Sequence, residues 1–245
     1  MSVAVITGAS SGLGRALARR LAEQGWQLVL DARNPQPLYR TADELAVHTT
    51  VTAVAGDVTE PRHRHALAQA AGSFGGVDLL VNNASSLGPT PLAGMTELEP
   101  ATFELILRTN VVAPLALIQL LRPWLRASAV VVNISSDAAI EHYPSWGGYG
   151  ASKSALDHLS ATLATEDPRH RYYAFDPGDM RTPMHQAAFP GEDISDRPWP
   201  LIVVPALLSL YRDRPASGRY RAADLQVPAG APAPQPDATV GGRRG

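Results

Sequence analysis

Three side chains in the middle of the chain have the types and spacing needed to exchange a proton with an alcohol oxygen. Tyr149 and Lys153 are four positions apart in a segment of helical character, so they lie on one face of the predicted helix. A free phenol titrates near roughly 10, and an adjacent ammonium favours the phenolate. Ser136 follows a predicted strand, and its hydroxyl is available to hold a substrate oxygen. Together the three residues predict general acid–base chemistry on an alcohol or carbonyl.

The composition singles out Lys153. Of the 21 basic residues, 20 are Arg and one is Lys. An ammonium is a compact charge with rotatable donors, whereas a guanidinium is a planar fork that stays charged. The single Lys therefore indicates a position where Arg does not serve.

A glycine-rich turn near the N-terminus predicts a nucleotide site. The sequence TGASSGLG at 7–14 lies between a predicted strand at 3–7 and an amphipathic helix at 13–24. Glycines permit positive φ and close backbone approach, and helix N-terminal amides can face a pyrophosphate. The position between strand and helix favours dinucleotide binding over a purely structural turn.

Two opposite charges lie at the end of the second predicted strand, 27–32, and just after it. Asp31 would accept hydrogen bonds from the ribose 2'-hydroxyl of NAD, whereas Arg33 would neutralise the 2'-phosphate of NADP. Spacing alone does not decide between them, and both side chains are also compatible with solvated loop charges.

Strands alternate with helices along most of the chain. Further strands are predicted at 51–55, 78–82, 130–134 and 172–176, and further helices at 61–71, 100–126 and 149–166. This alternation predicts an α/β fold: a single Rossmann-type, doubly wound parallel sheet flanked by helices on both faces. Ligands then bind beyond the carboxyl ends of the strands.

The C-terminal part is less regular. A loop at 180–200 is equally compatible with a lid and with a long connection, and a short helix at 205–211 and a strand at 220–227 follow. We expect residues 1–227 to form one NAD(P)-binding catalytic domain. The Pro/Ala/Gly-rich segment 228–245 has too few large apolar residues to form a core, and we expect it to be disordered.

Composition excludes several classes of function. With 21 basic and 23 acidic residues, the chain has no strong field for nucleic acid or an anionic membrane. There is no Cys, which removes disulfides and thiolate sites and favours the cytoplasm. The seven His residues show no zinc-site spacing, so no metal is expected. The N-terminus lacks a signal pattern, and no apolar run approaches the ~18 residues of a membrane span.

The motifs taken together resemble those of the short-chain dehydrogenase/reductase family, and the match extends over 3–227. In family order, the chain carries TGASSGLG at 7–14, GDV at 56–58, NNAS at 82–85, RTN around Asn110, NISS at 133–136, YGASK at 149–153 and DPGDMRT at 176–182. The resemblance implies an oxidoreductase that transfers hydride between a nicotinamide cofactor and a small alcohol or carbonyl substrate.

The resemblance also implies a role for each catalytic residue. Ser136 would bind the substrate oxygen, and Tyr149 would be the general acid/base. Lys153 would bind the nicotinamide ribose and lower the pKa of the Tyr. Asn110 would lie in a local helix distortion that holds a proton-relay water.

Cofactor contacts follow from the same resemblance. In relatives, the NAD-selecting acid stands where this chain has Ala32 and the NADP-selecting Arg stands at Arg33, so NADP is preferred over NAD. The residues implied to contact the cofactor are Gly8, Ser10, Ser11, Gly12, Leu13, Gly14, Arg33, Asp57, Val58, Asn83, Ala84, Tyr149, Lys153, Pro177, Gly178 and Thr182.

The substrate pocket is expected to be mostly apolar. Its candidate wall residues are Ser85, Leu87, His142, Trp146, Met184, His185 and Phe189. The helices around 105–121 and 156–163 correspond to the usual dimer surface of the family, so a homodimer is expected ahead of a tetramer.

Two other functions remain open at this stage. A dinucleotide-binding regulatory or scaffolding protein would sense the NADPH/NADP ratio without turnover, and it would carry a broken catalytic set. An epimerase or dehydratase would use the same Tyr and Lys without net consumption of cofactor. The intact Ser136, Tyr149 and Lys153 favour the oxidoreductase.

Overall fold

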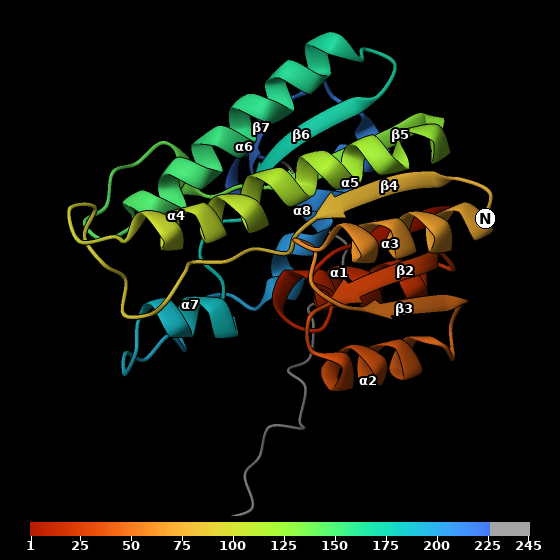
Figure 1. Cartoon of the computed structure of the whole chain (residues 1–245). Helices are drawn as coiled ribbons and strands as arrows, with labels where there is room; N and C mark the ends of the chain where they lie inside the picture. Colours follow the sequence, from red (N-terminus) through yellow and green to blue (C-terminus); the bar gives the residue numbers. More distant parts are fainter. Residues whose placement is uncertain (226–245) are drawn as a thin grey trace, which may run out of the picture.

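The computed structural model describes residues 1–225 and contains one sheet of seven parallel strands (Figure 1). The strand order is β3-β2-β1-β4-β5-β6-β7. The strands are β1 (Val3–Ile6), β2 (Gln27–Ala32), β3 (Val51–Ala55), β4 (Val77–Asn82), β5 (Leu125–Ile134), β6 (Arg171–Asp176) and β7 (Gly218–Arg221). The central strands are apolar and β-branched because helices bury both faces of the sheet.

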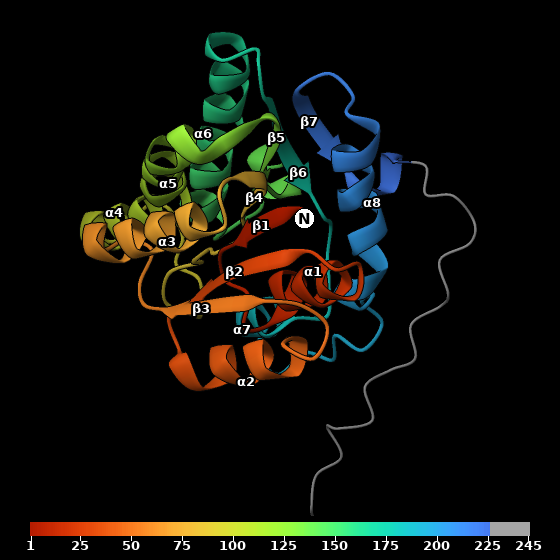
Figure 2. The ribbon, with the colours of Figure 1, turned by 90° about the vertical axis from the view of Figure 1, so that its right-hand side faces the viewer.

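Helices cover the two faces in separate layers (Figure 2). One layer contains α1 (Gly12–Glu23), α2 (Pro35–Leu45) and α8 (Pro200–Asp213); the other contains α3 (Pro61–Ser73), α4 (Pro100–Leu107), α5 (Ala113–Leu121) and α6 (Gly147–Glu166). Each layer packs on its own hydrophobic cluster of buried strand and helix side chains. This architecture confirms the expected doubly wound Rossmann-type sheet.

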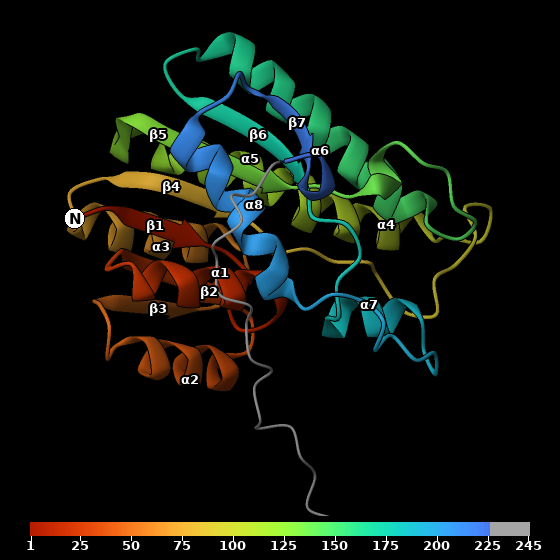
Figure 3. The same ribbon diagram turned by 180° about the vertical axis from the view of Figure 1, so that it is seen from behind.

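The strand order places a topological switch point at the neighbouring strands β1 and β4. After β3 at the sheet edge, the chain crosses back, and β4 pairs with β1 on the side opposite β2. Connections on either side of this switch point diverge and leave room for a ligand beyond the carboxyl ends of the strands. The short helix α7 (Pro183–Ala188) lies on that side of the molecule (Figures 1 and 3).

Helix α2 is an element that the sequence analysis did not assign. Asn34 caps it by accepting a hydrogen bond from the Gln36 backbone N–H, and Pro35 takes the first helical position. Leu38, with Ala42 and Leu45 behind it, buries the inner face. An Asn–Pro pair at a helix start is a recognisable signal, so this helix was within reach of sequence reasoning.

The helix expected at 100–126 is interrupted. A π-helix, Arg108–Val112, separates α4 from α5, and a 3₁₀ turn at Arg122–Trp124 ends the segment before β5 begins at Leu125. The expected C-terminal boundary is therefore wrong. Pro123 lies in the 3₁₀ turn and cannot donate the backbone hydrogen bond that would continue the helix.

The same segment, Pro100–Trp124, is 25 residues long with a mean hydropathy of 1.5 in its most apolar window. By length and composition alone it meets the criterion for a membrane span. From the sequence, no segment was expected to span a membrane, because polar residues at 108–110 interrupt the apolar run here. Buried residues make up 39% of that window. Leu117 and Ile118 of α5 pack in a buried cluster with side chains of α3 and the sheet. Core helices of globular proteins pass the same test, so it is weak evidence for a membrane.

The C-terminal part differs from expectation in its boundaries. The loop 180–200 contains α7, and α8 begins at Pro200 instead of 205 because Pro205 is accommodated inside the helix. The final strand, β7, runs from Gly218 to Arg221 and is followed by a 3₁₀ turn at Ala222–Asp224. The rest of the expected strand, 226–227, and the expected disordered tail, 228–245, lie outside the described residues.

Candidate active site

A cleft of about 720 Å³ opens at the carboxyl edge of the sheet. The glycine-rich turn, the ends of β2, β4, β5 and β6, and helices α6 and α7 contribute its walls. All the residues proposed from sequence for catalysis or cofactor contact line this cleft, except Gly14 and Asn110.

The turn after β1 is built from positive-φ glycines packed against the loop after β4. Gly8 has φ +65° and Gly12 has φ +54°. Asn83 ties the two loops together, because its Nδ2 donates to the carbonyls of Thr7 at 2.9 Å and Gly8 at 3.1 Å. A Cβ at Gly14 would lie 2.5 Å from the Gly8 oxygen. Gly14 therefore permits close packing and does not itself line the cleft.

The N-terminus of α1 faces this cleft without a side-chain cap. Ser11 occupies the N-cap position but makes no capping hydrogen bond, and no acidic residue lies in the first turn. Uncapped amides at a helix N-terminus, reinforced by the helix dipole, are suited to an anionic group. The residues present therefore fit the pyrophosphate of a dinucleotide.

The two charges at the end of β2, Asp31 within the strand and Arg33 just after it, have different environments. The Asp31 carboxylate is 1% exposed, accepts a hydrogen bond from the Gly8 backbone N–H and lies 2.5 Å from His63 Nε2. Burial raises its pKa, although the hydrogen bond and charge of His63 oppose this effect. Arg33, one residue beyond the strand, is exposed. The partners of the Asp31 carboxylate, Gly8 and His63, therefore lie within the protein. The Arg33 guanidinium is exposed and available to a ligand.

Ser136 follows β5 and begins a 3₁₀ turn at Asp137–Ala139. Its hydroxyl donates to Asp137 Oδ1 at 2.9 Å, and Tyr143 donates its phenol proton to Asp137 Oδ2 at 2.9 Å. Burial pushes the pKa of Asp137 upward, but the hydrogen bonds from Ser136 and Tyr143 outweigh it and leave that pKa below its ordinary value. An ionised carboxylate is therefore part of the cleft wall beside Ser136.

Tyr149 and Lys153 lie on successive turns of α6 and are both buried. Lys153 Nζ donates to the Ile134 carbonyl at 2.7 Å and lies 5.3 Å from the centre of the Tyr149 ring. Burial lowers the pKa of Lys153 to about 8, with an opposing effect from Asp157. Removal from water disfavours the charged ammonium.

The Tyr149 environment corrects one expectation. Burial raises the pKa of Tyr149 above that of a free phenol, and hydrogen bonding with Ser136 and Ser85 only partly offsets the rise. The sequence-based expectation of a pKa lowered toward neutrality is wrong for this environment, because desolvation of the phenolate outweighs the hydrogen bonds that favour it. A neutral phenol at physiological pH is the form that donates a proton.

Asn110 lies at the centre of the π-helix, is buried, and does not line the cleft. Its Nδ2 donates to the Ser86 carbonyl and to Ser152 Oγ, each at 2.9 Å. Its Oδ1 accepts hydrogen bonds from the Ser85 hydroxyl and the Ser86 backbone N–H. The side chain therefore joins the loop after β4 to α6, while the π-helix provides the local distortion that the family resemblance implied.

Aromatic rings form the outer wall of the cleft beyond Tyr149. The Trp146 ring centre is 5.7 Å from that of Tyr149 and 5.8 Å from that of Phe189. His185 stacks at a tilt against Phe189, with ring centres 4.9 Å apart. Of the seven candidate wall residues, only His142 is absent from the lining, because its side chain is exposed in the loop before α6.

The remaining cofactor candidates lie around the rim of the cleft. Thr182 caps α7 by accepting a hydrogen bond from the His185 backbone N–H, which engages its hydroxyl within the protein. Lining residues that the sequence analysis did not propose are Ala32, Asn34, Thr109, Ile134, Ser135, Asp137, Tyr143, Pro144, Asp176, Asp179, Met180 and Pro183. Several lie within or next to the quoted motifs NISS and DPGDMRT, so those motifs were the available signal.

Comparisons with known proteins agree on the family. A family model described as short chain dehydrogenase matches residues 2–193. An uncharacterized oxidoreductase of Staphylococcus epidermidis is 31% identical over 195 residues, which cover 78% of this chain and 83% of that protein. A short chain dehydrogenase structure from Shigella flexneri, complexed with NADP, has TM-score 0.83 and 28% identity over 91% of this chain and 97% of that chain. One from Escherichia coli, complexed with NADPH, has TM-score 0.82 and 29% identity over 90% and 96%. The chain belongs to the short chain dehydrogenase family of oxidoreductases.

Proposed function

We propose that this protein is an NADPH-dependent reductase of small carbonyl compounds, acting in reverse on the corresponding alcohols. The observation that carries the proposal is that Ser136, Tyr149 and Lys153 line the same cleft as the glycine-rich turn. The pocket beyond Tyr149 is mostly apolar and partly aromatic, which favours an apolar carbonyl substrate over a charged one.

Ser136, Tyr149 and Lys153 each have a separate role in the proposed reaction. A bound nicotinamide supplies hydride to the carbonyl carbon. The Ser136 hydroxyl hydrogen-bonds the carbonyl oxygen, and the neutral Tyr149 phenol donates a proton to that oxygen as negative charge develops. The Lys153 ammonium lies close enough to stabilise the phenolate that remains. In alcohol oxidation, the proton moves in the opposite direction.

The preference for NADP rests on the two charges at the end of β2. Asp31 is buried against His63, so its carboxylate is engaged within the protein, while Arg33 is exposed at the cleft. A guanidinium can bind a 2'-phosphate through two parallel hydrogen bonds. The Shigella flexneri and Escherichia coli structures, complexed with NADP and NADPH, support the same preference.

Replacing Arg33 with Ala is therefore expected to raise the Kd of NADPH about tenfold, since an exposed charge-assisted hydrogen bond contributes roughly 1.4 kcal/mol. The Kd of NADH should change by less than about twofold, because NADH has no 2'-phosphate. Nucleotide fluorescence titration measures both values. Arg212→Ala, which removes an exposed Arg at the end of α8, is the control. Equal weakening of NADPH and NADH would contradict the assignment of Arg33.

The reaction itself is tested by following NADPH absorbance with a panel of apolar ketones and aldehydes. Consumption of NADPH with any member, and formation of the matching alcohol, is the expected result. Tight NADPH binding without turnover across the panel would favour a regulatory dinucleotide-binding protein. Conversion of an alcohol substrate without net cofactor consumption would favour an epimerase or dehydratase.

The proposal also covers the extent of the catalytic domain, the location of the enzyme and its oligomeric state. We infer that residues 1–227 act as one catalytic domain, that the enzyme works in the cytoplasm, and that it forms a homodimer through α4, α5 and α6. Exposed apolar residues on that surface, Leu105 and Val112, support the dimer. Light scattering after size exclusion measures the mass, and a monomer would contradict it.

A further inference from the structure

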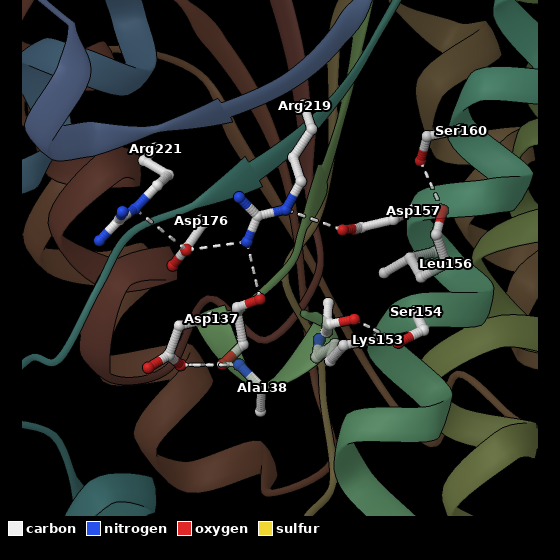
Figure 4. A network of polar contacts seen from close by, with 12 residues as sticks. Asp137, Ala138, Lys153, Ser154, Leu156, Asp157, Ser160, Asp176, Arg219 and Arg221 are labelled. Carbon is white, nitrogen blue, oxygen red and sulfur yellow. Dashed lines mark hydrogen bonds and ion pairs between the residues drawn. The ribbon is translucent and has the colours of Figure 1, made fainter. Parts of the chain in front are cut away.

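Arg219 connects three elements behind the candidate active site. Its side chain extends from β7 between Asp176 and Asp157 (Figure 4). The Nη2 atom donates to Asp176 Oδ2 and to the Ser136 carbonyl, each at 2.9 Å, and Nε donates to Asp157 Oδ2 at 3.0 Å. The Arg219 side chain is 21% exposed, Asp157 is 16% exposed and Asp176 is 2% exposed.

Each acceptor belongs to a segment that carries proposed catalytic or cofactor-binding residues. The carbonyl is that of Ser136 itself. Asp157 lies one helical turn after Lys153 on α6, and Asp176 ends β6 immediately before Pro177. One guanidinium therefore fixes the end of β5, the end of β6 and the face of α6 relative to one another. A planar fork with several donors in fixed directions is suited to this task.

The same guanidinium balances charge around Lys153 and Tyr149. Asp157 and Tyr149 belong to α6, Asp137 follows β5, Asp176 ends β6, and Arg219 and Arg221 belong to β7. Asp157 raises the pKa of Lys153, and Asp137 and Asp176 raise that of Tyr149. Arg221 lies 3.9 Å from Asp176, but its side chain is 59% exposed. Arg219 is thus the more buried of the two β7 cations that oppose these carboxylates.

We propose that Arg219 is a positioning residue of the active site, which holds the Ser136 backbone and the Lys153 turn in register and neutralises Asp157 and Asp176. The proposal rests on the proposed function for its kinetic consequences only. The predicted change in the protonation of Lys153 can be measured without a known substrate.

The single Lys allows a direct test. Protein labelled with ¹³C-lysine gives one set of side-chain signals, those of Lys153, whose Cε shift follows its protonation. The expected midpoint for the unmodified protein is about 8. Arg219→Met should raise the midpoint by about half a unit to one unit, because a cation is lost and Asp157 is left unbalanced. Asp157→Asn should lower it, because the carboxylate that favours the ammonium is removed.

A second variant separates charge from geometry. Arg219→Lys keeps the cation, so the Lys153 midpoint should return to within about 0.3 units of the unmodified value. The ammonium lacks the planar fork, so kcat should stay about tenfold below normal in Arg219→Lys and fall ten- to a hundredfold in Arg219→Met, with the KM for NADPH within about twofold. If either substitution merely loosened the site and admitted water, the Lys153 midpoint would shift in both Arg219→Lys and Arg219→Met.

Arg212→Met is the control, since it removes an exposed Arg of α8 that pairs with Asp213, and it should leave the Lys153 midpoint within about 0.3 units and kcat within about twofold. Circular dichroism establishes folding, and if Arg219→Met does not fold, Arg219→Lys and Asp157→Asn carry the test. An unchanged Lys153 midpoint in both Arg219→Met and Asp157→Asn, or normal kcat in Arg219→Lys, would overturn the proposal. If the unmodified protein reduces no carbonyl, the proposed function fails, while the Lys153 titration still decides the role of Arg219.

Discussion

Replacing Tyr149 with Phe is expected to lower kcat for carbonyl reduction by about a thousandfold, within the range contributed by general acid catalysis. The Phe ring keeps the packing against Trp146, 5.7 Å away, but lacks the hydroxyl that donates the proton. Binding of NADPH should change by less than about twofold, because the ring remains and only one oxygen is removed. The defect should therefore be confined to the chemical step.

Single-turnover mixing of the enzyme–NADPH complex with a carbonyl substrate measures that step directly. Tyr39→Phe, which removes a hydroxyl from a half-exposed Tyr of α2, controls for nonspecific effects and should leave kcat unchanged. Normal turnover by Tyr149→Phe on a verified substrate would contradict the assigned role.

Lys153→Arg is expected to lower kcat by about a hundredfold although it conserves the charge. Lys153 is 2% exposed and its Nζ is 2.7 Å from the Ile134 carbonyl, so a wider guanidinium must displace packed neighbours. Burial of a larger group in a close-packed interior distorts the surrounding side chains. A displacement of about 1 Å in a catalytic group costs about a hundredfold in rate.

The pH profile distinguishes this effect from simple misfolding. Because burial lowers the pKa of Lys153 to about 8, the ammonium is present below that pH and lost above it. Reduction by the unmodified enzyme should therefore decline above about pH 8. In Lys153→Arg, the residual rate should lack this decline, since a guanidinium stays charged. Full activity in Lys153→Arg would remove the reason for the single Lys in this chain.

Much of the fold follows from local pattern, because strands and helices alternate with clear periods and a parallel sheet has few allowed connections. Boundaries depend on less regular features. The π-helix around Asn110 has no periodic signal, since the apolar pattern continues on both sides. Helix α2 was missed although Asn34 and Pro35 mark its start.

Some residues of the candidate site could likewise be predicted from sequence motifs, and others could not. Ser136, Tyr149 and Lys153 belong to compact motifs, and the structure brings them to one cleft. His63 and Arg219 belong to no such motif, and their partners are distant in sequence: Asp31 for the first, Asp157 and Asp176 for the second. Such pairs depend on the sheet order, which brings β2 near α3 and β6 beside β7. Sequence spacing cannot predict them.

The π-helix at Arg108–Val112 has a consequence for how this chain can change in evolution. A π-helical turn closes its hydrogen bonds over five residues instead of four, so it accommodates one residue more than the α-helix on either side. It is equivalent to a one-residue insertion into an otherwise continuous helix. Deleting one residue there would let α4 and α5 join as regular α-helix with their buried faces kept against the sheet, while Asn110 would lose its links to Ser86 and Ser152. Loss of the site and loss of the fold are therefore separable by a single deletion.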